Sequence, residues 1–259
     1  MSIERRTVEA NGLRIAYGAI GDGPPLILLH GATSSGGAGF RAQAARFGRS
    51  FRCYLPDARG HGGTRWDPTG GFSYATLVDD LAAFVDAVGL DGVHLLGVSM
   101  GAQTALGYAI RQPERVASLV LVGLSVAAEP RTSVVRRLLD VDRIEREDPR
   151  FAAELAARHD PEQGPGAWRR LLRAMAAAIE RDPPPTPAEI RRATAPALVV
   201  VGDRDPIVPV DQAWALARQL PDGRLLVLPA AGHEVHAQRA GLFNEACEWF
   251  WRAVGAIGG

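Results

Sequence analysis

Hydrophobic and polar residues alternate over the first twenty positions, on either side of Asn11-Gly12. Alternation with a period of two is typical of a half-buried β-strand, and Asn-Gly is a strong signal for a two-residue hairpin turn. The pattern therefore predicts that two antiparallel strands open the fold.

Six later segments are short and apolar on both faces, as strands between two layers of helices must be. They lie at residues 25–30, 51–56, 93–98, 117–122, 197–201 and 225–228. Apolar residues at helical spacing follow or separate them at 74–88, 102–111, 210–220 and 242–254. This succession predicts an α/β fold with a mostly parallel, eight-stranded sheet and helices on both faces.

The pattern changes between about Ser125 and Thr194, where helical stretches are broken by Pro- and Gly-rich turns and no strand-like run occurs. We interpret this stretch as a helical insertion that forms a cap over the carboxyl edge of the sheet. The alternative is a group of packing helices far from any site. The expected organisation is a core of residues 1–124 and 195–259, with the cap at 125–194.

Composition narrows the possible partners. Among 259 residues, 29 basic side chains balance 29 acidic ones and 47% are apolar, which is typical of a globular domain without a basic surface for nucleic acid. No apolar run is long enough for a membrane span, and the amino terminus does not look like a signal peptide. We therefore expect no nucleic-acid or membrane partner and a cytoplasmic location, while a homo-oligomer is possible.

The most informative motif is Gly97-Val98-Ser99-Met100-Gly101, between a buried strand and a helix. A serine on such a sharp strand-to-helix turn projects out of the sheet, and the small residues around it give the backbone room. Ser99 is therefore the candidate nucleophile. The alternative is that Ser99 merely caps the following helix through its side chain.

A serine nucleophile needs a base, and His233 lies directly after the last core strand, at the same sheet edge. His236 is the competing candidate. A metal clip formed by these two histidines lacks further ligands, so we expect no metal. Because active sites collect in the loops at the carboxyl ends of parallel strands, His233 is the favoured base.

A carboxylate must orient the imidazole, and the loop after the strand at 197–201 offers Asp203 and Asp205. Asp203 could pair with Arg204 inside the loop, whereas Asp205 stands further out, before a proline. We favour Asp205. The chain order Ser99, Asp205, His233 is the order that accompanies a nucleophile elbow.

Four separated motifs make the chain resemble the α/β-hydrolase family over nearly its whole length. They are His30-Gly31-Ala32, Asp57-Ala58-Arg59-Gly60-His61-Gly62, the elbow around Ser99, and Gly202-x-x-Asp205-x-x-x-Pro209 followed by Gly232-His233. The resemblance implies carboxylic-ester chemistry on a triad of Ser99, Asp205 and His233. We expect Asp57, Arg59 and His61 to be structural, with a short-range Asp57–Arg59 ion pair.

The oxyanion of such a reaction needs backbone N–H donors that already point at it. Met100 supplies one, because it begins a helix, where amides are unpaired and the dipole favours an anion. The resemblance implies a second donor in the loop after His30-Gly31. This is Ala32, with Thr33 as the adjacent alternative.

These observations predict a hydrolase that cleaves a small carboxylic ester or lactone through an acyl-enzyme and needs no cofactor. C–C, amide or thioester hydrolysis and cofactor-free perhydrolysis are alternatives on the same triad, and a ligand-binding module is a further one. Haloalkane dehalogenases and epoxide hydrolases of this fold use an aspartate nucleophile, which Ser99 disfavours. The resembling C–C hydrolases commonly carry Asn and Trp where this chain has Val98 and Glu234.

Overall fold

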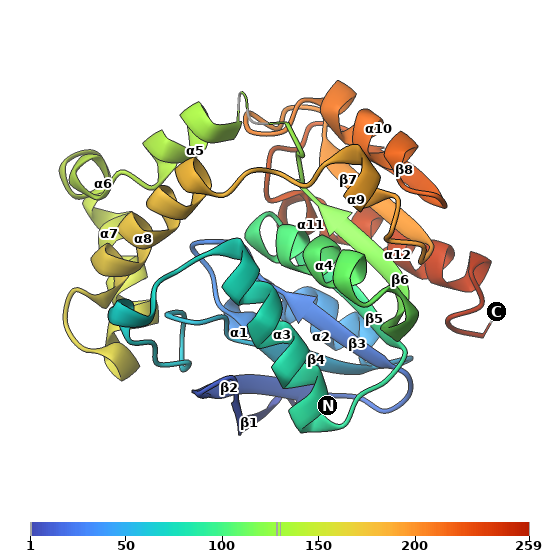
Figure 1. Ribbon diagram of the computed structural model, residues 1–259, viewed down its shortest axis with the longest axis horizontal. Coiled ribbons are helices and arrows are strands. Elements are labelled where there is room, and N and C mark those ends of the chain that lie inside the picture. Colours follow the sequence, from blue (N-terminus) through green and yellow to red (C-terminus); the bar gives the residue numbers. More distant parts are fainter. Residues whose placement is uncertain (1, 128, 130, 259) are drawn as a thin grey trace.

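The computed structural model describes residues 2–127, 129 and 131–258. The terminal residues 1 and 259, and residues 128 and 130 of the predicted insertion, lie outside this set. An eight-stranded sheet runs through the described molecule in the order β1-β2-β4-β3-β5-β6-β7-β8 (Figure 1). The strands are β1 (Glu4–Ala10), β2 (Leu13–Ile20), β3 (Pro25–Leu29), β4 (Arg52–Pro56), β5 (Val93–Val98), β6 (Val116–Val122), β7 (Ala197–Gly202) and β8 (Gly223–Leu228).

The first two strands form the predicted hairpin, with Ala10 opposite Leu13. Asn11 and Gly12 have φ of 49° and 69°, the left-handed conformation that a tight hairpin turn requires. β2 also runs antiparallel to β4, and from β4 to β8 every neighbouring pair is parallel. The carboxyl ends of these parallel strands therefore meet at one edge of the sheet.

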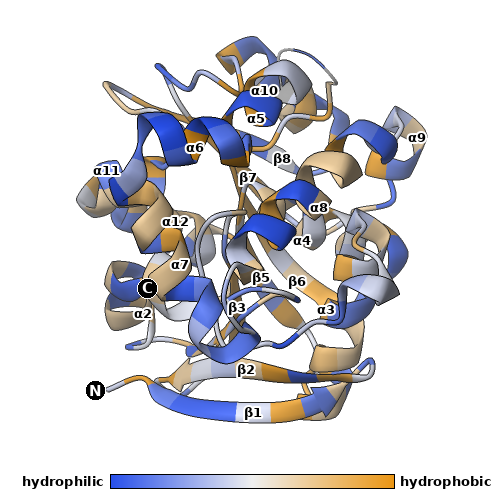
Figure 2. Cartoon of the chain, turned by 90° about the vertical axis from the view of Figure 1, so that its left-hand side faces the viewer, coloured by the Kyte–Doolittle hydropathy of each residue, from blue (hydrophilic) through white to orange (hydrophobic). Residues whose placement is uncertain are grey.

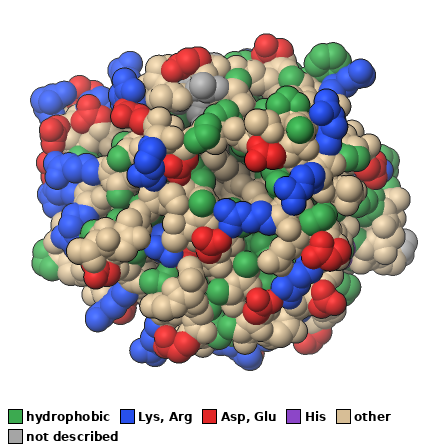
Figure 3. Space-filling view, in the orientation of Figure 1, with side chains coloured by type: hydrophobic (Ala, Val, Ile, Leu, Met, Phe, Trp, Pro, Cys, Tyr) green, Lys and Arg blue, Asp and Glu red, His purple; other side chains and the backbone are tan. Residues whose placement is uncertain are grey.

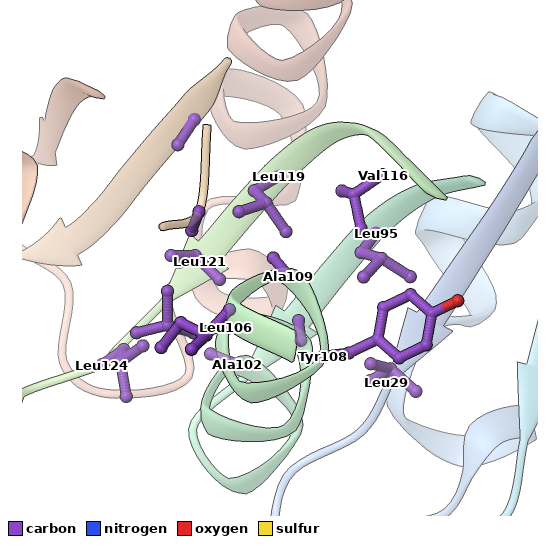
Figure 4. Packing of buried hydrophobic residues seen from close by; sticks show 14 of the residues in the cluster. Leu29, Leu95, Ala102, Leu106, Tyr108, Ala109, Val116, Leu119, Leu121 and Leu124 are labelled. Carbon is purple, nitrogen blue, oxygen red and sulfur yellow. The ribbon is translucent and has the colours of Figure 1, made fainter. Parts of the chain in front are cut away.

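Two helical layers cover the sheet, because side chains of the central strands alternate between its faces. In β5, Val93 and Leu95 belong to one core, whereas Leu96 and Val98 belong to the other. The first core lies under α3 (Tyr74–Val88), α4 (Met100–Arg111), α9 (Pro187–Ile190) and α10 (Val210–Gln219); the second lies under α2 (Arg41–Phe47) and α12 (Ala240–Ala253). Figure 4 shows α4 packed onto the first core, and Figure 2 shows apolar and polar residues divided between the faces of the helices.

The segment between β6 and β7 is helical and stands beside the core at its carboxyl edge (Figure 1). Its helices are α5 (Arg131–Leu138), α6 (Val141–Glu147), α7 (Pro149–Gln163) and α8 (Ala167–Arg181). Their apolar faces form a third cluster, which includes Trp168 and Leu172, and this cluster reaches Leu77 and Met100 of the core. Ile190 of α9 packs in the first core instead. The exact domain division stays a prediction.

The predicted fold class is confirmed, and most predicted elements agree with the structure within one or two residues. Three short helices were not predicted: α1 (Gly36–Gly39), α2 and α11 (Val235–Gln238). The remaining elements are the 3₁₀ turns Pro68–Gly70 and Pro113–Arg115. Among the described residues, no helix has both the length and the apolar character to cross a membrane. Basic and acidic side chains are interspersed on the face shown in Figure 3.

Candidate active site

Ser99 occupies a strained turn between β5 and α4. Its φ of 53° and ψ of −111° lie in a region that non-glycine residues rarely adopt. A Cβ at Gly97 would collide with the backbone of Gly101, and a Cβ at Gly101 would collide with the carbonyl oxygen of Leu29. The two glycines therefore permit the turn that projects Ser99. The Ser99 side chain makes no capping hydrogen bond to α4, so the alternative role as a helix cap does not apply.

Asp205 and His233 are joined by a hydrogen bond at the same sheet edge. His233 Nδ1 lies 2.8 Å from Asp205 Oδ2, and the Asp205 side chain is fully buried. The other carboxylate oxygen accepts hydrogen bonds from the N–H groups of Ile207, at 2.8 Å, and Val208, at 3.0 Å. Because a carboxylate accepts hydrogen bonds, it favours the imidazole tautomer with the proton on Nδ1.

The imidazole of His233 lies against Gly123, just after β6. A Cβ at Gly123 would approach His233 Cε1 to 2.8 Å, so a larger residue there would displace the ring. Gly123 follows Val122, whose carbonyl oxygen accepts a hydrogen bond of 2.8 Å from the N–H of Ser99. His233 Nε2 is buried and has no hydrogen-bond partner among the described residues. The structure therefore brings Ser99, Asp205 and His233 to the carboxyl edge of the sheet and leaves His233 Nε2 available there as a hydrogen-bond acceptor.

The two competing candidates have other contacts. His236 is buried between Phe40 and Phe243, with ring centroids at 5.5 and 6.3 Å. Asp203 accepts a hydrogen bond from the N–H of Ala231 at 3.1 Å and forms no ion pair with Arg204 in the described part of the chain. Neither His236 nor Asp203 contacts the Asp205–His233 pair through a hydrogen bond. No cluster of metal-ligating side chains occurs among the described residues.

Hydrogen bonds hold the carbonyl group of Gly31 in the loop after β3, and they thereby set the direction of the Ala32 N–H in the same peptide. The carbonyl oxygen of Gly31 accepts from Ser34 N at 3.1 Å and lies 2.9 Å from His30 Nδ1. His30 Nε2 in turn accepts from the N–H of Ala58 at 3.0 Å, which places the His30 proton on Nδ1. In a trans peptide the N–H points opposite to the preceding C=O, so these contacts orient the Ala32 N–H.

Met100 is the first residue of α4, and its N–H is one of the amides that a helix leaves without an intrahelical partner. Met100 and Ala32 both line the cavity that contains Ser99. This cavity is lined mainly by apolar groups and by a few polar side chains: Ala32, Tyr74, Ser99, Met100, Gln103, Gly123, Leu124, Ser125, Val135, Ile179 and Ile207.

The expected Asp57–Arg59 ion pair is wrong. Arg59 makes a bidentate ion pair with Asp80 of α3, with both N–O distances at 2.6 Å. Asp57 instead accepts hydrogen bonds from the N–H groups of Gly36, at 2.8 Å, and Gly63, at 2.9 Å. The physical reason is that unpaired loop amides need the nearby carboxylate, whereas the buried guanidinium needs a carboxylate in its own plane. The structural role expected for both side chains stays a prediction.

The helical insertion contacts the loop that carries Ala32, which the sequence did not indicate. The Arg158 guanidinium of α7 donates a hydrogen bond to the carbonyl oxygen of Thr33. His159 is buried beside His61, with ring centroids 5.3 Å apart, and its Nδ1 accepts from the N–H of Gly62 at 3.2 Å. These contacts fix α7 against the loops after β3 and β4.

The neighbouring side chains of His30, His61 and His159 are neutral near neutral pH. Burial lowers the pKa of His30 to about 4 and that of His61 to about 4. Burial also lowers the pKa of His159 to about 2, and the neighbouring imidazoles add to this shift. A proton on any of these rings would be poorly solvated, and a second proton on a neighbouring ring would also be repelled by the first.

We expect the free energy of unfolding to fall as the pH is lowered from about 6.5 to about 4. Above this range both states are neutral, and the stabilisation is complete. Below about pH 6.5 the unfolded chain binds protons that the native His30, His61 and His159 do not yet accept, which favours unfolding. Each group contributes a slope of up to about 1.4 kcal/mol per pH unit, measurable by urea denaturation at several pH values.

His159→Asn is the matched control, because the amide oxygen of asparagine can still accept from the N–H of Gly62. This variant should lose up to about 1.4 kcal/mol per pH unit of the slope, while titrating carboxylates affect both proteins equally. The same slope in the variant and the wild type would contradict a neutral His159 in the native state.

Comparisons with known proteins agree with the fold described above. The model of the alpha/beta hydrolase family matches residues 26–246. A 2-hydroxymuconate semialdehyde hydrolase from Pseudomonas putida is 30% identical, over 97% of this chain and 95% of the relative. A solved esterase from Thermogutta terrifontis is 27% identical, with a TM-score of 0.77 over 97% of this chain and 99% of the esterase. Est816, described as an N-acyl homoserine lactone degrading enzyme, is 26% identical, with a TM-score of 0.76 over 95% of this chain and all (100%) of that structure. The chain is a hydrolase that belongs to the α/β hydrolase family.

Proposed function

We propose that this hydrolase cleaves small, uncharged carboxylic esters or lactones through an acyl-enzyme at Ser99. The observation that carries the proposal is the part-buried Asp205–His233 pair, 2.8 Å apart. The Nε2 atom of His233 has no hydrogen-bond partner in the described part of the chain and lies near the strained turn at Ser99. A serine hydroxyl becomes an effective nucleophile only when such a base can take its proton.

In this mechanism the Ser99 hydroxyl oxygen attacks the substrate carbonyl carbon, and its proton moves to His233 Nε2. The Asp205 carboxylate stabilises the resulting imidazolium through Nδ1. The N–H groups of Ala32 and Met100 bind the oxyanion of the tetrahedral intermediate. His233 then gives the proton to the leaving oxygen as its bond to the acyl carbon breaks. In the second half, His233 takes a proton from a water molecule whose oxygen attacks the acyl carbon, and it returns that proton to Ser99 Oγ as the bond to the acid breaks.

The cavity lining favours an uncharged substrate. Apolar side chains such as Leu124, Val135 and Ile179 dominate it, and the polar ones are those of Tyr74, Gln103, Ser99 and Ser125. Among its described lining residues there is no lysine or arginine. A substrate carboxylate buried in this cavity would lack a cationic partner, which is costly.

C–C hydrolysis is the second candidate, because relatives named as hydrolases of 2-hydroxymuconate semialdehyde and of 2-hydroxy-6-oxo-6-phenylhexa-2,4-dienoate are 30% and 28% identical to this chain. A dienoate carries a carboxylate, and the cavity lining offers it no positive charge. The same Ser99, Asp205 and His233 would serve either reaction, so substrate binding discriminates between them.

A substrate panel tests the proposal. We expect continuous turnover of p-nitrophenyl acetate and butyrate and of a small γ-lactone, and values of kcat/KM at least about tenfold lower for a 2-hydroxy-6-oxodienoate. The opposite ranking would make the C–C reaction the function. Release of at most one equivalent of nitrophenol per chain, without continued turnover, would support a ligand-binding module instead.

A further inference from the structure

A second cavity lies directly behind the candidate active site. It lies between α3, α4, β2, β3 and the loop after β4. The mechanism proposed above does not use it. Its only lining residue shared with the Ser99 cavity is Met100, within the part of the chain that the structure describes.

The same elements line both cavities at successive positions. On α3, Tyr74 faces the Ser99 cavity, and Leu77, one turn further along, faces the second cavity. On α4, Gln103 lines the Ser99 cavity, and the next residue, Thr104, lines the second cavity. The two spaces are therefore consecutive along the groove between these helices, and the buried Met100 side chain stands at their junction.

The second cavity, which we call the rear chamber, suits an aliphatic chain. Its walls include Ile15, Leu29, Leu77, Leu81 and Phe84. Its polar groups already have partners, because the Arg59–Asp80 pair is bidentate at 2.6 Å and the Thr104 hydroxyl donates to the Met100 carbonyl at 3.0 Å. A ligand in the chamber would find apolar surface and few unsatisfied polar atoms.

The chamber lies on the acyl side of the reaction centre. The leaving group must approach His233 Nε2, which gives it a proton, and Gly123 is the residue of the cavity wall that lies against His233. Gly123 does not line the chamber, whereas His30 and Met100, from the oxyanion loop and helix α4, do. An acyl chain that points away from His233 and past the oxyanion donors is therefore directed at Met100.

We propose that the rear chamber is an extension of the acyl subsite and that the Met100 side chain closes it, so that Met100 limits the length of the straight acyl chain. This inference rests on the proposed ester hydrolysis. Methionine is unbranched and flexible, so it fills the junction without a rigid wall. Shortening it joins the two cavities while its backbone N–H stays available to the oxyanion.

The first experiment measures kcat/KM for p-nitrophenyl esters from acetate to decanoate. In Met100→Ala the ratio of octanoate to acetate should rise about tenfold or more relative to the wild type, because several methylene groups gain a buried site. Met100→Val is the second truncation, which removes less of the core packing and should shift the ratio in the same direction. An unchanged chain-length profile in both folded variants would overturn the proposal.

Leu81→Phe places a larger side chain of α3 in the chamber. It tests whether the higher octanoate-to-acetate ratio of Met100→Ala depends on the chamber. Combined with Met100→Ala, it should return the octanoate-to-acetate ratio to within about threefold of the wild-type value. The matched control is Leu124→Ala, which also enlarges the Ser99 cavity, but at a residue that does not line the chamber. Any rise in the octanoate-to-acetate ratio of Leu124→Ala should persist when Leu81→Phe is added. If the rise in Met100→Ala also persists when Leu81→Phe is added, the chamber is not the acyl subsite.

A binding measurement separates this inference from the proposed reaction. Calorimetry with the uncharged probe octanamide should show tighter binding, by about tenfold, to Ser99→Ala/Met100→Ala than to Ser99→Ala, and acetamide should show no such gain. If the wild type hydrolyses no ester but octanamide gains affinity, the subsite stands and the proposed reaction fails. If esters are hydrolysed and octanamide gains nothing, the subsite fails alone.

Discussion

Replacing Ser99 with alanine is expected to lower kcat/KM for ester substrates by about three to six orders of magnitude. The hydroxyl is the only group that the proposed mechanism joins covalently to the acyl carbon. His233 and the oxyanion donors would remain in place, and they account for the residual rate over the uncatalysed reaction. Initial rates with p-nitrophenyl butyrate at high enzyme concentration measure this loss.

The same variant should keep its fold. Alanine retains the Cβ of serine, so the backbone strain at φ of 53° is unchanged, and the Ser99 side chain forms no helix-capping bond that could be lost. We expect a thermal midpoint within about 2 °C of the wild type. A folded Ser99→Ala protein that retains a tenth of the wild-type activity would refute the nucleophile assignment.

Local sequence signals predicted most of the fold because they have local physical causes. Helix α3 begins and ends where expected, since the Ser73 side chain accepts from Thr76 N at 3.0 Å and Gly89 ends the helix at φ of 72°. Helix α2 was not predicted, because it has only seven residues (Arg41–Phe47) and follows a glycine-rich segment. Its buried positions, such as Ala44 and Phe47, are too few to show a period.

The candidate active site was largely predictable because the end of a parallel strand determines where its following loop lies. That rule assembles Ser99, Asp205 and His233 from three distant segments. It does not identify pairing between elements, so Arg59 was assigned to Asp57, whereas its observed partner is Asp80. The cavity walls contributed by the helical insertion depend on how that insertion packs, which periodicity does not determine.

Asp205→Asn is expected to lower kcat/KM by about three to four orders of magnitude. In the wild type Oδ1 accepts from the N–H groups of Ile207 and Val208, at 2.8 and 3.0 Å. The asparagine oxygen must take that position, because an NH₂ group cannot accept those bonds. The NH₂ group then faces His233 Nδ1, which must accept a hydrogen bond, so the imidazole proton moves to Nε2 and blocks proton transfer from Ser99.

Asp203→Asn is the matched control for this substitution. Both changes lie in the same loop, remove one negative charge, introduce an amide and leave the side-chain volume nearly the same. Within the described residues the Asp203 side chain accepts one hydrogen bond, from the N–H of Ala231 at 3.1 Å, and an asparagine oxygen can accept the same bond. Its kcat/KM should therefore stay within about tenfold of the wild type. Equal losses in the two variants would mean that loop charge, rather than the tautomer of His233, controls the rate, and a larger loss in Asp203→Asn would transfer the orienting role to Asp203.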